Sequence, residues 1–213
     1  GRAAYAAPAA ALLLFLSLPM VGIPNNAIRL LLTTFLWVAT SLAWNLLGGV
    51  AGQVSFGFAV FYGLGAYTAG LSINAGVPAY AAIAAGGAVA AFGSVLIGIP
   101  TFRLRGPYFA IATIGVNEAV RIVMSNLEIS GGASGIRLMQ SGRFSQAEHY
   151  YAAFVVAALA FLVSWRVTRS PFGLALRAIR EDQDAAADVG VRPFLCKLTV
   201  HALAACLTGI AGG

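Results

Sequence analysis

Long apolar segments joined by short polar loops constrain this chain more than any other feature of its sequence. Hydrophobic residues make up 60% of the 213 residues and charged residues only 9%, whereas a soluble domain carries about 25% charged residues. A helix needs about 20 apolar residues to cross the hydrocarbon core of a bilayer. Several segments are that long, so the sequence predicts an all-α, polytopic membrane protein.

Hydropathy places about seven membrane spans in the chain, with glycine-rich breaks between some of them. The predicted spans are residues 4–21, 28–47, 56–73, 77–99, 107–124 and 151–167, and a last one from 198 onward. The chain starts with Gly-Arg and ends inside an apolar segment, so we expect it to be truncated, with further spans after Gly213. Residues 1–213 are expected to form a single transmembrane domain.

The distribution of arginine predicts the orientation, because positively charged loops stay on the cytoplasmic side. Arg103 and Arg105 follow the fourth span, and a larger basic group lies between the sixth and seventh spans. Both loops fall on one side together with the amino terminus. Residues 168–197 are therefore expected to be cytoplasmic, and residues 125–150 form an exterior loop. This distribution accounts for the net charge of +6 without nucleic-acid binding.

No cofactor or metal is expected. Cys196 and Cys206 are the two cysteines, and they fall at the start of and inside the last apolar segment. That placement predicts neither a disulfide framework nor a metal site. The sequence also offers no nucleophile and base in a recognisable arrangement, which disfavours a membrane-embedded enzyme.

Residues 170–190, SPFGLALRAIREDQDAAADVG, form a polar segment before the last span. Ser170 and Pro171 are typical of a helix start, and Gly190 of a helix end, so we expect one helix here. A helix that lies on anionic lipid should be mainly basic, but residues 181–188 carry several acidic side chains. The segment therefore predicts docking into a groove of another protein.

Two regions are candidates for a translocation pathway. Residues 48–57, GGVAGQVSFG, must be packed in protein or line an aqueous cavity, because irregular backbone cannot face lipid. A packing contact followed by a tight turn is an equally open interpretation. Inside the fifth span, ionisable residues favour a bundle interior or a water-filled path, although a Glu118–Arg121 pair that fixes helix packing is the alternative. The pathway candidates are Gly49, Gly52, Gln53, Ser55, Asn117 and Glu118.

Four blocks of the sequence, at residues 48–70, 103–115, 131–136 and 170–191, occur in an order that resembles one family. The chain is similar to the LivM-type permease subunits of branched-chain amino acid ABC importers, a family that includes urea and short-chain amide permeases. In ABC importer permeases a cytoplasmic helix with the pattern E-A-A-x-x-x-G docks into the ATP-binding subunit. The resemblance places this pattern on the polar segment, with Asp in place of Glu. The ATPase-coupling residues it implies are Arg177, Glu181, Asp184, Ala185, Ala186 and Gly190.

The resemblance implies a multi-pass subunit of a bacterial inner membrane that moves a small amino acid-like solute inward. A branched-chain amino acid is the expected solute, with urea or an amide as alternatives. The implied partners are two ATP-binding subunits, a second related permease subunit and an extracytoplasmic binding protein. No G-x-x-x-x-G-K-[ST] motif occurs, so the partners would hydrolyse ATP and this chain is not expected to be an enzyme. An ion-coupled secondary transporter that uses Glu118 is the alternative function.

Overall fold

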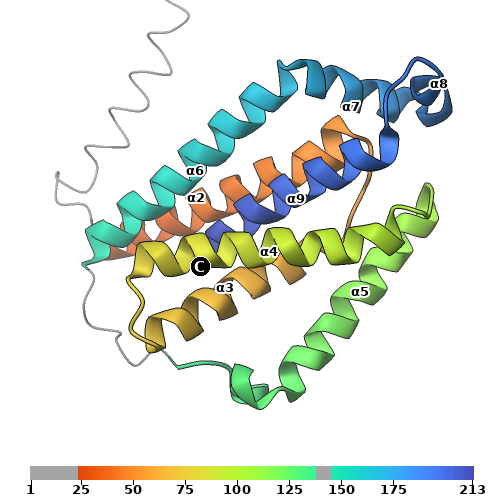
Figure 1. The fold of residues 1–213 in the computed structure, drawn as a ribbon. Helices are drawn as coiled ribbons and strands as arrows, with labels where there is room; N and C mark the ends of the chain where they lie inside the picture. Colours follow the sequence, from red (N-terminus) through yellow and green to blue (C-terminus); the bar gives the residue numbers. More distant parts are fainter. Residues whose placement is uncertain (1–23, 138–144) are drawn as a thin grey trace, which may run out of the picture.

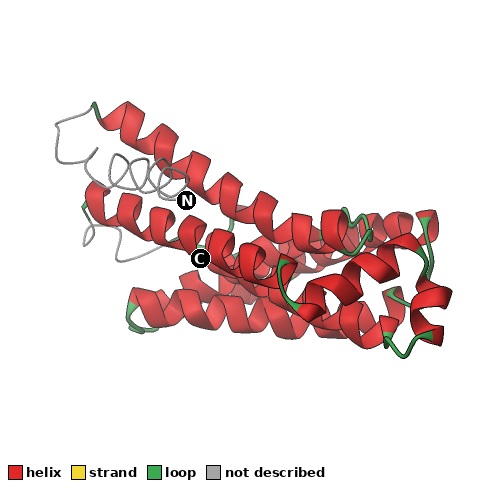
Figure 2. Cartoon of the chain, turned by 90° about the horizontal axis from the view of Figure 1, so that it is seen from above, coloured by secondary structure: helices red, strands yellow, loops and turns green. Residues whose placement is uncertain are grey.

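The computed structural model describes residues 24–137 and 145–213, and its regular elements in these ranges are all helices (Figures 1 and 2). The long helices are α2 (Asn25–Asn45), α3 (Phe58–Asn74), α4 (Ala79–Thr101), α5 (Pro107–Asn126), α6 (Gln146–Thr168) and α9 (Pro193–Gly212). The short elements are η2 (Leu46–Val50), η3 (Glu128–Ser130), η4 (Gly132–Ser134), α7 (Pro171–Glu181) and α8 (Gln183–Asp188). The predicted all-α class is confirmed.

Four of the described helical segments are long and apolar enough to cross a membrane, namely Asn25–Val50, α4, α6 and α9. Helix α3 matches the third predicted span but has only 17 residues, and α5 matches the fifth but carries Asn117, Glu118 and Arg121. The expected count of about seven spans is therefore higher than the described residues show. The first predicted span, at residues 4–21, lies outside them.

The predicted exterior loop at residues 125–150 is shorter than expected, because α6 begins at Gln146. A capping box starts this helix: the hydroxyl of Ser145 accepts a hydrogen bond from the backbone N–H of Glu148, and the Glu148 carboxylate accepts one from the N–H of Ser145. Such reciprocal bonds satisfy donors that a helix start leaves free. Residues 146–150, which were predicted to belong to the loop, therefore form the start of α6.

Helix α9 is the centre of the bundle and lies against α2, α3 and α4 (Figure 1). In α9, half of the residues in the most apolar stretch are buried. The corresponding share is 22 to 33% in the other three candidate spans. Where α3, α4 and α9 cross, glycines bring backbone against backbone. A Cβ added at Gly65 would lie 2.0 Å from the carbonyl oxygen of Gly209, and one added at Gly86 would lie 2.8 Å from that of Gly65. Small residues permit such close approach between membrane helices.

Helix α5 stands apart from this centre (Figure 1). Its buried residues are Phe109 and Thr113. The ring of Phe109 stacks on that of Phe102 with 5.1 Å between ring centroids, and Phe102 in turn packs against His201 of α9. These contacts attach the first half of α5 to the bundle and leave the second half loosely packed.

Adding a methyl group at the glycine crossing should weaken the bundle. We expect Gly65→Ala to lower the free energy of unfolding by about 1 to 3 kcal/mol, because overpacking forces the helices apart. Thermal unfolding of the detergent-solubilised protein measures this change. The matched control is Gly63→Ala on the same helix, where an added Cβ meets nothing within 4 Å. Equal stability of the two variants would contradict the proposed tight crossing.

Candidate functional site

The predicted coupling segment and the glycine-rich break meet at one end of the bundle. Helices α7 and α8 lie there with η2 and the turn between α4 and α5 (Figure 1). Basic residues gather at the same end: Arg103, Arg105, Arg166, Arg169, Arg177, Arg180, Arg192 and Lys197. The structure therefore joins two segments that the sequence presents separately.

The ends of the polar segment agree with the sequence prediction. The hydroxyl of Ser170 accepts a hydrogen bond from the N–H of Gly173 at 3.2 Å and so caps α7. After α8, Gly190 has a φ of 91°, a left-handed conformation that glycine adopts without steric cost. Both signals are local, which is why the sequence alone reveals them.

The single helix predicted for residues 170–190 is in fact two helices. Asp182 has extended backbone, with φ −152° and ψ 115°, and separates α7 from α8. Its Oδ1 accepts hydrogen bonds from the N–H groups of Asp184 and Ala185, at 2.8 and 3.0 Å. These two donors hold the pKa of the Asp182 carboxyl below its usual value. The extended backbone at Asp182 ends α7, and its side chain caps the start of α8.

Two side chains from the rest of the bundle position α8. Arg105, in the turn between α4 and α5, donates two hydrogen bonds to the carboxylate of Asp184, at 3.0 and 3.2 Å. Lys197 of α9 donates to the side-chain oxygen of Gln183. The Arg105 and Asp184 side chains are 66% and 73% exposed, so this ion pair adds little to stability. It connects α8 to the turn between α4 and α5.

Arg180 connects α7 to the glycine-rich break. Its Nη1 donates a hydrogen bond of 2.9 Å to the carbonyl oxygen of Gly49. Gly49 lies near the end of η2, where carbonyl groups lack partners within the helix. The same side chain fills the space beside Gly52, since an added Cβ there would lie 2.7 Å from Arg180 Cγ. Sequence reasoning missed Arg180, because nothing local to it indicates a partner 131 positions away.

The break is only partly packed in protein: Val50, Ala51 and Ser55 are buried, but Gly52, Val54 and Phe56 are exposed. Ser55 is buried, and its hydroxyl accepts from the N–H of Gly57. Trp44 Nε1 donates to the Ser55 carbonyl oxygen at 2.8 Å, and the N–H of Phe56 donates to the hydroxyl of Thr113 on α5 at 3.0 Å. These bonds explain Ser55 as a turn residue. A pathway role for Ser55, Gln53 and the glycines stays a prediction.

The predicted Glu118–Arg121 pair forms on α5. Arg121 Nε donates to Glu118 Oε2 at 2.9 Å, and Arg121 Nη2 donates to Oε1 at 2.5 Å. The two side chains are 52% and 66% exposed. The pair lies within one helix and does not join α5 to another described helix, so its geometry does not explain helix packing.

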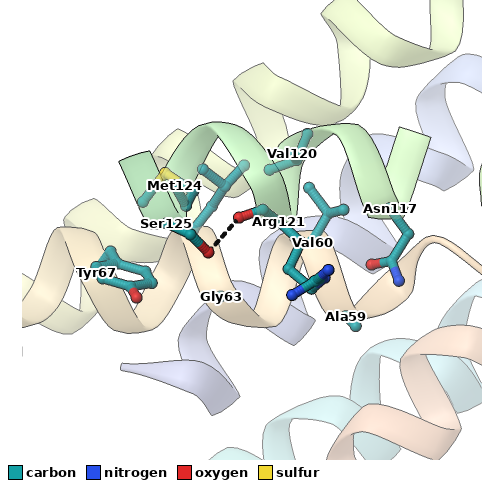
Figure 3. A pocket seen from close by; sticks show the side chains of 10 residues that line it. Ala59, Val60, Gly63, Tyr67, Asn117, Val120, Arg121, Met124 and Ser125 are labelled. Carbon is teal, nitrogen blue, oxygen red and sulfur yellow. Dashed lines mark hydrogen bonds between the residues drawn. The ribbon is translucent and has the colours of Figure 1, made fainter. Parts of the chain in front are cut away.

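A cavity of about 240 Å³ lies between α3 and α5, and Arg121 and Asn117 line it (Figure 3). Thr113, which bonds the glycine-rich break, precedes Asn117 by one turn of α5. The break also leads directly into α3, whose first turns form the other wall. The predicted pathway residues therefore occupy two adjoining regions rather than one site.

A bundle of apolar helices with a polar helix pair at one end is the architecture of a multi-pass membrane protein. Residues 26–213 match the family described as "branched-chain amino acid transport system / permease component". The chain belongs to this family, which confirms the resemblance in the sequence.

Curated relatives carry the name LivM. The chain is 29% identical to the high-affinity branched-chain amino acid transport system permease protein LivM of Salmonella typhimurium, over 89% of this chain and 52% of the relative. Identity to LivM of Escherichia coli K12 is 30%, over 84% and 49%. A probable LivM of Methanocaldococcus jannaschii is 30% identical over 54% and 35%. The chain spans about half the length of the first two relatives. No solved structure matches significantly.

Removal of the Asp182 cap should loosen α8. We expect Asp182→Ala to speed amide hydrogen exchange at Asp184 and Ala185 several-fold at neutral pH, because both N–H groups lose their acceptor. Since the pKa of Asp182 is lowered, the cap is complete above the usual value of 3.8 and is lost as the pH falls through the lower, folded value. Asp182→Asn keeps an acceptor and is the control. Unchanged exchange in Asp182→Ala would contradict the cap.

Proposed function

We propose that this chain is a membrane-spanning permease subunit of an ABC importer that moves a small amino acid-like solute inward. Separate ATP-binding subunits would drive it through α7 and α8. The observation that carries the proposal is the hydrogen bond from Arg180 to the Gly49 carbonyl, which ties the polar helix pair to the glycine-rich break. A carrier without a motor subunit has no need of such a connection.

The basic end of the bundle faces the cytoplasm in this proposal, with the amino terminus on the same side. The gathering of arginines around α7 and α8 supports this orientation. The solute is a branched-chain amino acid, as the names of the relatives suggest, with urea or an amide as alternatives. The bilayer is a bacterial inner membrane.

The surface of α7 and α8 indicates which residues would meet an ATP-binding subunit. Arg177, Glu181 and Ala185 are exposed, and Val189 is 81% exposed. Ala186 is buried within this chain, and the Asp184 carboxylate already accepts hydrogen bonds from Arg105. Arg177, Glu181, Ala185 and the apolar Val189 would therefore form the contact. The role of Ala186 and Asp184 would be to hold α8 in place, while Gly190 permits the exit turn.

Closure of the ATP-binding subunits would displace α8 and, with it, α7. The Arg180–Gly49 hydrogen bond would carry this displacement to the break, and the Phe56–Thr113 bond would carry it to α5. ATP would thus bias an equilibrium between two arrangements of the bundle. A second related permease subunit and an extracytoplasmic binding protein complete the proposed transporter.

The energy source separates this proposal from an ion-coupled carrier. In vesicles that hold the full-length permease, its permease partner, both ATP-binding subunits and the binding protein, we expect labelled leucine uptake to require ATP and to survive collapse of the proton gradient. The control is a partner ATP-binding subunit that lacks its P-loop lysine. Uptake that does not depend on ATP and stops when the proton gradient collapses would favour the alternative, in which Glu118 carries the proton.

Loss of the Arg180 contact should uncouple transport from ATP hydrolysis. We expect Arg180→Met to reduce uptake about fivefold or more while ATP hydrolysis continues, since coupling free energies between sites typically correspond to about 5- to 150-fold. The ratio of solute moved to ATP hydrolysed measures the effect. Arg166→Met, an exposed arginine at the same end, is the matched control. A normal ratio in Arg180→Met would rule out this connection.

A further inference from the structure

The cavity between α3 and α5 is lined by both apolar and polar side chains. Val60, Leu64, Val120 and Met124 supply aliphatic surface. Its polar side chains are Tyr67, Asn117, Arg121 and Ser125, and Figure 3 shows Arg121 between Tyr67 and Asn117. Pockets for drug-sized ligands measure about 300 to 1,000 Å³. A volume of about 240 Å³ therefore suits one small solute, and the mixed lining suits a solute that carries both charge and aliphatic surface.

Arg121 is the one charged side chain among the described residues that line this cavity. A guanidinium group has five N–H donors in a planar fork. Its side-chain bonds to described residues use Nε and Nη2, both toward Glu118, so Nη1 has no partner among those residues. A carboxylate that enters the cavity can accept hydrogen bonds from the remaining donors, in the paired geometry that arginine favours.

Glu118 is a competitor for the same guanidinium. It does not line the cavity, yet it accepts two hydrogen bonds from Arg121 across one turn of α5. Both side chains are more than half exposed, so exchange of one carboxylate for another needs no rearrangement of the core. The ion pair with Glu118 compensates the charge of the Arg121 guanidinium.

The opposite charge of a zwitterion also finds a partner here. Asn117 lies one turn before Arg121 and lines the same cavity. Its side-chain carbonyl oxygen accepts hydrogen bonds and suits an ammonium group. Urea and neutral amides lack the carboxylate that Arg121 would recognise, so the lining favours an aliphatic α-amino acid over them.

We propose that this cavity is a solute-binding site, in which Arg121 binds the carboxylate of an aliphatic α-amino acid in exchange for Glu118. The inference rests on the proposed function and names where that function selects its solute. The site adjoins the coupling route, because Thr113 on α5 holds the glycine-rich break one turn before Asn117. Displacement of the break would therefore reshape the cavity.

Ligand protection in the absence of ATP tests the site directly. Met124→Cys places a thiol on the cavity wall, in the full-length permease with all its native cysteines, Cys196 and Cys206 included, replaced by serine. We expect leucine to slow maleimide labelling of this thiol, and leucinamide to need about tenfold or more higher concentration, because it lacks the carboxylate that a charged hydrogen bond would hold. The control is Ile122→Cys, an exposed residue of α5 outside the cavity, whose labelling should not respond.

Two charge variants give opposite expectations. Arg121→Gln should weaken protection by leucine about tenfold or more and bring it close to that of leucinamide, whereas Glu118→Gln should strengthen it by removing the competing carboxylate. A pair with a structural role only would weaken protection in both variants, and that result would overturn the proposal. Arg103→Gln, in the turn between α4 and α5, controls for loss of positive charge.

The outcomes separate this site from the coupling proposal. Equal protection by leucine and leucinamide would overturn the carboxylate site even if uptake remains driven by ATP. Selective protection by leucine, together with uptake that does not depend on ATP, would support the site and reject the ABC mechanism. Because labelling needs no ATP, an uncoupled transporter still reports on the cavity.

Discussion

The need to satisfy every backbone polar group inside a membrane governs this structure. Helices meet it within themselves, so the chain is almost entirely helical in its described parts. Where the chain leaves the helix after η2, side chains supply the missing partners. Trp44 donates to the break from α2, Thr113 accepts from α5, and Arg180 donates from α7. The irregular segment is therefore the point where three helices are fastened together.

This arrangement explains why glycine stands at positions 49 and 52 of the break. Gly52 has a φ of 70° and lies against the Arg180 side chain, so a larger residue would be strained and would also displace the arginine. Gly49 presents the carbonyl group that the arginine binds. The absence of a side chain at Gly52 leaves room for the Arg180 side chain, through which α7 contacts the break.

Signals confined to a short stretch were predictable, and contacts between distant stretches were not. Hydropathy located the long helices, and Ser170 and Gly190 marked the ends of the polar segment correctly. The break at Asp182 was missed, because several acids stand nearby and the sequence does not tell which one turns back to cap a helix. Arg180–Gly49 and Arg105–Asp184 depend on the tertiary fold. Helix α3, with 17 residues, also resembles a full span by composition alone.

The crossing of α3, α4 and α9 at Gly65, Gly86 and Gly209 packs these three helices more closely than α5 is packed. Where backbone touches backbone, no side-chain rotamer can absorb a shift, so these helices must move as one body. Helix α5 is attached mainly through Phe109 and Thr113 and can tilt separately. In the proposed transport cycle, tilting of this single helix would leave the lipid contacts of α3, α4 and α9 unchanged.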